Sequence, residues 1–405
     1  MIADALRRPG AVLLDAPRPD ADSGRRGARV FRDPVRQIVA RAHAEVPAAL
    51  DALDAALADG LHVAGMVSYE AGEALAPVVF DARPSPVPLV WFGAYRGTTE
   101  VDALEVGAGL PASAAPVEGP AFALSRDAYR DAVAAVKRHI RAGDVYQVNL
   151  TAPIRFGYHG DPLALYAALR RRQSVAYGAY LRCPGAAVAS VSPELFFRID
   201  REATNEIGGA GARTITARPM KGTAPRAASA RADDALAQAL QKSPKDRAEN
   251  LMIVDLLRND LARVSETGSV RVPALFEAER YETVTQMTST VAATLRPDAG
   301  LADVLRALFP CGSVTGAPKL RAMQLIRELE GGPRGVYCGA IGHAAPDGTA
   351  AFNVAIRTAV VGDDGGGRYD VGSGIVWDSD ADAEYAECQL KAQVLTDLGA
   401  DPARP

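Results

Sequence analysis

The apolar positions of this chain follow two periods, which predict strands and helices in a mixed order. Alternation or short apolar runs predict strands over 62–69, 89–95, 145–157, 175–183, 186–190, 194–200, 213–218, 336–344, 351–361 and 368–376. Helical spacing predicts helices over 128–142, 162–172, 230–241, 245–263, 301–307, 317–328 and 380–396. Because consecutive strands are joined by short turns such as 362–367, we expect antiparallel sheets and an α+β fold class.

The first 120 residues carry fewer recognisable elements. Helical spacing predicts a helix over 35–57, either kinked or divided in two at Pro47. The Pro/Ala/Gly-rich stretch 111–120 predicts a linker or long loop, and Ser125 is expected to cap the helix after it. We therefore expect an N-terminal part over 1–115 and a catalytic region over 120–400, within one compact domain.

Composition indicates an ordinary globular protein, because 48% of the 405 residues are hydrophobic and 23% are charged. The net charge of −4 and the absence of a basic run argue against a nucleic-acid partner. No apolar run reaches the roughly 18 residues that a membrane span needs, so no membrane contact is expected. The four cysteines are far apart, which favours reduced thiols in the cytoplasm over a disulfide framework or a zinc site.

Two pairs of acidic residues are spaced for one helix face each. Asp246 precedes Glu249 by three residues, and Glu384 precedes Glu387 by three, with Lys391 four residues further on. Two helices that present such pairs could hold a hard divalent cation, and Mg²⁺ fits because it takes oxygen ligands and keeps several waters. Acid pairs at this spacing are also common on exposed helices, so a solvated surface remains the alternative.

Lys221 stands in a turn, Pro219–Thr223, between a predicted strand and a predicted helix. The apolar Met220 would desolvate the amine and lower its pKa, and Gly222 would let a ligand approach the backbone. These are the requirements of a buried amine nucleophile, although an exposed turn is the commoner reading of such a segment.

Two further features point to an anionic ligand. Arg357 lies on an otherwise apolar predicted strand, so it needs a carboxylate from the protein or from a substrate. Thr315 or Gly316 is expected to cap a helix with Pro318 in its first turn, where backbone N–H groups could bind a carboxylate.

Six segments in collinear order resemble the motifs of the chorismate-utilising enzymes. They cover residues 120–396 and comprise 143–149, 192–194, 219–223, 245–261, 312–319 and 384–387. That family includes the anthranilate, aminodeoxychorismate, isochorismate and salicylate synthases. The resemblance implies a sandwich of two large antiparallel sheets, with helices outside and the site between the sheets.

The resemblance also implies roles for individual residues. Glu249 and Glu387 would hold Mg²⁺, with Asp246 and Glu384 supporting it directly or through waters. Glu194 would be the general acid for the departing 4-hydroxyl of chorismate, and Lys221 would attack C2 before ammonia adds at C4. The residues expected to bind the substrate are Gln147, Thr223, Gln286, Ser313, Tyr337, Arg357, Gly372, Gly374 and Lys391.

Three positions distinguish the branches of that family. Lys221 favours the aminodeoxychorismate synthases, since anthranilate synthases carry alanine there. Gln147 replaces the lysine that activates water in isochorismate and salicylate synthases, and Gln286 replaces a histidine of anthranilate synthases. The alternatives are an anthranilate synthase component, an isochorismate or salicylate synthase, and a non-catalytic homologue that binds chorismate.

The ammonia has no evident source within this chain. No cysteine stands in the Gly-x-Cys-x-Gly setting of a glutamine-hydrolysing site, since Cys311 follows Pro310 and lies within a chorismate-type motif. The resemblance therefore implies a separate glutamine amidotransferase subunit as partner. The product would be 4-amino-4-deoxychorismate, a precursor of 4-aminobenzoate and folate.

Overall fold

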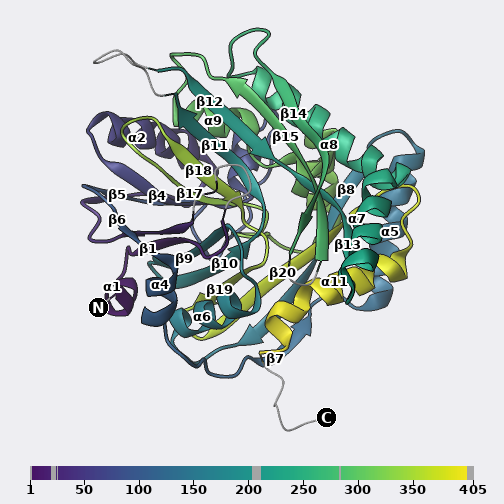
Figure 1. Ribbon diagram of the computed structural model, residues 1–405, viewed down its shortest axis with the longest axis horizontal. Coiled ribbons are helices and arrows are strands. Elements are labelled where there is room, and N and C mark those ends of the chain that lie inside the picture. Colours follow the sequence, from purple (N-terminus) through teal and green to yellow (C-terminus); the bar gives the residue numbers. More distant parts are fainter. Residues whose placement is uncertain (1, 20–23, 25, 203–210, 282–283, 399–405) are drawn as a thin grey trace.

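Two antiparallel sheets make up most of the structure. The computed structural model describes residues 2–19, 24, 26–202, 211–281 and 284–398, and within them each sheet has ten strands. The sheets face each other and the helices cover their outer sides (Figure 1). The α+β sandwich expected from the sequence is confirmed.

The first sheet joins strands from both ends of the chain. Its strand order is β16 (Gly316–Ala317), β8 (Gln147–Gly157), β20 (Gly366–Ile375), β19 (Thr358–Gly362), β10 (Ala186–Ser192), β9 (Tyr177–Cys183), β1 (Val12–Ala16), β2 (Gly27–Phe31) and β6 (Thr99–Val101), with β7 (Glu118–Phe122) on β8. The hairpin expected at 362–367 joins β19 to β20.

The second sheet likewise joins segments that are far apart in the sequence. Its order is β13 (Met220–Pro225), β15 (Val284–Thr294), β12 (Arg213–Arg218), β11 (Leu195–Arg201), β18 (Ala350–Val354), β17 (Ala340–Ala344), β4 (His62–Val67), β5 (Val90–Tyr95) and β3 (Arg36–Ala40), with β14 (Arg271–Arg280) on β15.

Helices pack on the outer face of each sheet. Among them α5, α6, α10 and α11 pack on β8, β10 and β20 of the first sheet, whereas α2, α7 and α8 pack on strands of the second. The helices are α1 (Ile2–Leu6), α2 (Val46–Ala58), α3 (Ala71–Leu75), α4 (Ala103–Gly109), α5 (Arg126–Arg141), α6 (Pro162–Arg172), α7 (Ala230–Lys242), α8 (Pro244–Ala262), α9 (Leu301–Leu308), α10 (Lys319–Leu329) and α11 (Ala381–Thr396), with 3₁₀ turns at His43–Glu45 and Gly312–Val314. No helix in the described ranges is both long and apolar enough to cross a membrane.

The strand alternation divides the apolar residues between two cores. Val12, Met66 and Trp91 belong to a buried cluster that is built from strands of both sheets. Their neighbours Leu13 and Val67 point the other way and join a larger cluster that includes the buried faces of the helices. Both faces of these strands are therefore buried, as expected for a sheet covered on each side.

The chain crosses between the two sheets at two adjacent points. Residues 193–194 connect β10 of the first sheet to β11 of the second, and residues 355–357 connect β18 back to β19. The backbone N–H of Val354 donates to the carbonyl of Glu194 at 3.0 Å, and that of Val191 donates to Arg357 at 3.0 Å. The prediction of one strand over 351–361 is wrong, because the chain changes sheets at Arg357, whose φ is 51°.

The predicted helix over 35–57 is also wrong in its first half. Residues 36–40 form strand β3, in which Ile38 and Ala40 are buried, and α2 begins only at Val46. Pro47 lies in the first turn of α2, where its missing N–H would have had no helical partner, so it produces no kink.

Several strands were not predicted, and others have different limits. Those absent from the prediction include β1, β2, β13, β14 and β15. The turn expected at 219–223 lies largely in β13, and the strand expected over 336–344 begins only at Ala340. Pro318, rather than Thr315 or Gly316, is the N-cap residue of α10, and β7 occupies the end of the expected linker. Ser125 caps α5 as expected, accepting a hydrogen bond from the backbone of Ala128.

Candidate active site

A polar cavity of about 240 Å³ gathers almost every residue that the sequence singled out. Both sheets line it, together with α8 and α11. The predicted residues on its wall are Glu194, Lys221, Thr223, Asp246, Glu249, Gln286, Ser313, Tyr337, Arg357, Gly372, Gly374, Glu384, Glu387 and Lys391. Gln147 is the exception, since it is fully buried and is not among the residues that line the cavity.

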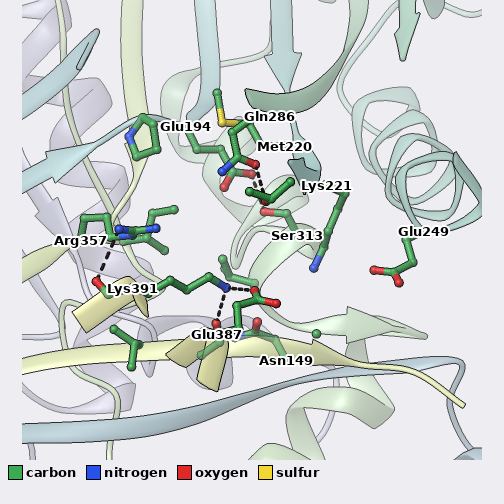
Figure 2. Close-up of a pocket in the computed structure, with 18 of the residues that line it drawn as sticks. Asn149, Glu194, Met220, Lys221, Glu249, Gln286, Ser313, Arg357, Glu387 and Lys391 are labelled. Carbon is green, nitrogen blue, oxygen red and sulfur yellow. Dashed lines mark hydrogen bonds and ion pairs between the residues drawn. The ribbon is translucent and has the colours of Figure 1, made fainter. Parts of the chain in front are cut away.

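Glu194 is a buried carboxyl on the first of the two sheet crossings. The residue is 3% exposed, and its Oε1 accepts a hydrogen bond from the Ser313 hydroxyl at 2.7 Å (Figure 2). Burial raises the pKa of Glu194 to about 7, while Ser313 and the positive charge of Lys221 lower it. A carboxyl with this pKa can be protonated near neutral pH and can give up its proton, as a general acid must.

Lys221 lies on edge strand β13 and reaches into the cavity (Figure 2). The strand is irregular there, because its register on β15 shifts between Met220 and Thr223 and Gly222 has φ +95°. Met220 also lines the cavity, and its sulfur lies 4.0 Å from the Tyr281 hydroxyl. Thr223 donates a hydrogen bond to Gln286 Oε1 at 3.0 Å, which ties this part of the wall to β15.

Two glycines of β20 keep the base of the cavity open. A Cβ on Gly374 would stand 2.8 Å from Lys221 Nζ and 2.4 Å from Gln147 Nε2. A Cβ on Gly372 would stand 3.0 Å from the Tyr337 hydroxyl. Gln147 Nε2 therefore lies close to Lys221 Nζ on the same side of Gly374, and neither the Nε2 nor the Oε1 of Gln147 has a hydrogen-bond partner in the described protein atoms.

Two cations lie at the side of the cavity where α11 meets the second sheet crossing. Lys391 Nζ donates to the Gly372 carbonyl at 2.7 Å and pairs with Glu387 at 2.5 Å. Arg357 Nη1 donates to the Lys391 carbonyl at 3.4 Å. These positive groups can bind the carboxylates of an anionic substrate.

The four predicted metal ligands lie on two helices that flank the cavity. Asp246 and Glu249 lie on α8, and Glu384 and Glu387 lie on α11, so both pairs are helical as expected, and all four residues line the same cavity. They do not form a preassembled cluster: in the described residues no group of three or more His, Cys, Asp or Glu side chains is arranged to hold a metal ion. Figure 2 shows Glu249 well separated from Glu387.

The surroundings of these carboxyls differ. Burial raises the pKa of Glu249, and the charges of Asp246 and Glu384 add to this effect. Burial tends to raise the pKa of Glu387, but the pairing with Lys391 and the charges of Lys221 and Arg357 together lower it. All four side chains offer the oxygen donors that a hard divalent cation takes, so the donor chemistry fits Mg²⁺.

Several residues of the wall were not predicted as site residues, among them Asn149 and Asp370. Asn149 lies on β8 and Asp370 on β20, and both line the cavity. Asp370 accepts hydrogen bonds from Arg368 Nε at 2.8 and 2.9 Å. Strand alternation in the sequence could have identified Asp370 as a wall residue, because Asp370 shares the inward face of β20 with Gly372 and Gly374.

Comparison with known proteins agrees with this geometry. Residues 12–397 match the family described as chorismate binding enzyme. The chain belongs to this family. Both the family and the fold expected from the six motifs are thereby confirmed.

Relatives within the chorismate binding enzymes differ in name. The chain is 45% identical over 284 residues to aminodeoxychorismate synthase of Streptomyces pristinaespiralis, covering 70% of this chain and 38% of that protein. It is 43% identical over 265 residues to aminodeoxychorismate synthase component 1 of Klebsiella aerogenes, covering 65% and 56%. The solved anthranilate synthase component I of Streptococcus pneumoniae TIGR4 is 26% identical, with a TM-score of 0.74 over 92% of each chain. The matched regions thus span about half, or less, of the two curated relatives.

Proposed function

We propose that this chain is the chorismate-aminating component of an aminodeoxychorismate synthase, which replaces the 4-hydroxyl of chorismate by an amino group. The observation that carries the proposal is the joint placement of Lys221 and Glu194 on one cavity wall, within electrostatic reach of each other. A nucleophile and an acid are the two groups needed to displace a hydroxyl, which is a poor leaving group until it is protonated.

The reaction would proceed in two displacements. Lys221 Nζ forms a bond to C2 of chorismate, both ring double bonds shift toward C4, and the C4–O bond breaks while Glu194 protonates the departing oxygen, which leaves as water. Ammonia nitrogen then bonds to C4, both double bonds shift back, and the electron pair of the Nζ–C2 bond returns to the lysine. The carboxylate of Glu194 accepts the surplus proton from the added nitrogen. Chorismate and ammonia thus give 4-amino-4-deoxychorismate and water.

The other side chains on the wall would bind and orient the substrate. Arg357 and Lys391 carry positive charge opposite the carboxylates of chorismate, and the glycine surfaces of β20 leave room for its ring. Glu249 and Glu387 would hold Mg²⁺, with Asp246 and Glu384 supporting it. When bound, Mg²⁺ would neutralise the ring carboxylate.

Ammonia would come from a partner subunit that hydrolyses glutamine. The printed name "component 1" of the Klebsiella relative supports a partner of this kind, and we propose a glutamine amidotransferase. We also propose a cytoplasmic location, in keeping with four free, buried cysteine thiols. The product would then serve 4-aminobenzoate and folate synthesis.

An anthranilate synthase component is the second candidate, because the matched Streptococcus structure bears that name. Analysis of the products from chorismate, ammonium and Mg²⁺ separates the two. The proposal predicts 4-amino-4-deoxychorismate, which keeps its enolpyruvyl group, so no pyruvate is released. Release of pyruvate together with fluorescent anthranilate would contradict it, and binding of chorismate without turnover would favour a non-catalytic homologue.

A further inference from the structure

Behind the cavity lies a buried ion pair that the proposed chemistry does not use. Arg334 lies between α10 and β17, and its side chain is 1% exposed. Its Nε and Nη2 donate to the two carboxylate oxygens of Glu330 at 2.9 and 2.6 Å. The pair is bidentate and nearly dry, and such a geometry fixes the orientation of the guanidinium plane.

The remaining N–H groups of Arg334 reach two segments that build the cavity wall. Nη1 donates to the carbonyl of Val314 at 2.8 Å, and Nη2 also donates to the carbonyl of Asn149 at 2.6 Å. Val314 and Asn149 both line the cavity, and they belong to the glycine-rich turn at 312–316 and to β8. One planar group thus spans the junction between this turn and the strand beside it.

Glu330 and Glu70 extend this framework. Glu330 Oε1 also accepts the backbone N–H of Thr151 at 3.0 Å, a second contact with β8. The carboxylate of Glu70 accepts the backbone N–H groups of Arg334 at 2.6 Å and of Gly335 at 3.0 Å, which fixes the segment that carries the arginine. None of these three charged side chains lines the cavity, so they act on it only through the backbone that they bind.

We infer that Arg334, oriented by Glu330, is a positioning residue that holds the turn bearing Ser313 at hydrogen-bonding distance from Glu194. Val314 follows Ser313 directly, so a shift of its carbonyl moves the Ser313 hydroxyl. A lysine at this position has no planar fork and at most three N–H donors, whereas Arg334 makes four hydrogen bonds to three residues. The structural role of Arg334 rests on these contacts alone, whereas its effect on catalysis rests on the proposed function.

The test compares Arg334→Lys with Arg327→Lys. Arg327 is a matched control, because it also pairs with a buried glutamate, Glu73, at 2.7 Å, and its side chain donates hydrogen bonds to Glu73 and Asp81, neither of which lines the cavity. We expect Arg334→Lys to lower kcat roughly 10- to 100-fold with little change in KM. We expect Arg327→Lys to lower the melting temperature without a comparable loss of kcat.

The pH profile of activity distinguishes the positioning of Ser313 from a contribution to stability alone, because a loss of stability would leave the profile unchanged. The groups that lower the pKa of Glu194 are the Ser313 hydroxyl, the charges of Lys221 and Lys391 and a hydrogen bond from the Met220 backbone. The Cys311 thiol lies beside Ser313. If Arg334 positions Ser313, Arg334→Lys weakens the hydrogen bond to Glu194 and moves the alkaline limb of kcat/KM to higher pH. Ser313→Ala should move the limb in the same direction, and the double variant should move it no further.

Three results would overturn the inference: an unmoved alkaline limb in Arg334→Lys, a kcat loss no larger than that of Arg327→Lys, or fully additive effects with Ser313→Ala. Should Arg334→Lys not fold, Glu330→Gln takes its place, because it keeps the side-chain shape and removes the orienting charge. The titration of Glu194 can also be followed by carbon NMR of its labelled carboxyl without substrate. That measurement tests the inference even if the wild-type chain does not consume chorismate, which would refute the proposed function instead.

Discussion

The Ser313 hydroxyl donates a hydrogen bond to Glu194 at 2.7 Å, although 119 residues separate the two in the chain. Glu194 lies where the chain passes from the first sheet to the second, and Ser313 lies in the 3₁₀ turn before α10. The contact fixes one oxygen of the buried Glu194 carboxyl and orients this carboxyl toward the cavity. The acid on which the proposed reaction depends is therefore held by tertiary structure.

The raised pKa of Glu194 predicts how activity depends on pH. Burial raises this pKa to about 7, and only the protonated form can serve as the acid. We expect the contribution of Glu194 to kcat/KM to be level below pH 7 and to fall about tenfold per pH unit above it as Glu194 ionises, superimposed on the opposite pH dependence of the amine nucleophile and of ammonia, which both react unprotonated. Glu194→Gln should lower kcat by roughly 10²- to 10⁴-fold and abolish this limb. An unchanged limb in Glu194→Gln would assign the titration to another group.

Gly374 predicts a steric effect at the reacting amine. Gly374→Ala places a methyl group 2.8 Å from Lys221 Nζ and 2.4 Å from Gln147 Nε2, so we expect kcat/KM to fall roughly 100-fold through displacement of both side chains. Gly97→Ala is the matched control, since a Cβ there meets no atom within 4 Å. Steady-state kinetics and thermal melting of both variants distinguish the two effects. Equal kinetics in the two variants would mean that the space beside Lys221 is not used.

The carboxylates of α8 and α11 predict dependence on a divalent cation. Glu249→Gln removes a charge from a proposed ligand, so we expect the Mg²⁺ concentration for half-maximal activity to rise by roughly 10- to 100-fold or more. Calorimetric titration with Mg²⁺ should show the same loss of affinity. Glu328→Gln, on the exposed part of α10, should behave as the wild type. A cation requirement that Glu249→Gln leaves untouched would remove Glu249 from the site.

The parts of the fold that were predictable from the sequence are those with local patterns. The acid pairs of α8 and α11 were placed on one helix face each because helical spacing is set within a few residues. Strand β3 was taken for part of a helix, since five residues with two buried positions carry little periodicity. Strand β13 was taken for a turn, because its partner β15 lies about 60 residues further along the chain.

The candidate site was likewise predictable from the sequence only in part. Motif resemblance identified the residues on the wall, but it could not show that Arg357 lies at a crossing between sheets or that Gln147 lies beside Lys221 at Gly374. Both facts depend on which strands pair, and that is decided by contacts between distant segments. The separation of Glu249 from Glu387 likewise depends on how two helices pack and not on their sequences taken singly.

The most direct test of the account is the product and rate obtained with Lys221→Ala. Chorismate, ammonium and Mg²⁺ are supplied to the wild type, to Lys221→Ala and to the control Lys242→Ala, in which the lysine lies on the exposed end of α7. The account predicts 4-amino-4-deoxychorismate from the wild type and the control, and a loss of at least about 100-fold in its formation by Lys221→Ala, or diversion toward anthranilate. An unchanged rate and product in Lys221→Ala would contradict the assignment of Lys221 as nucleophile.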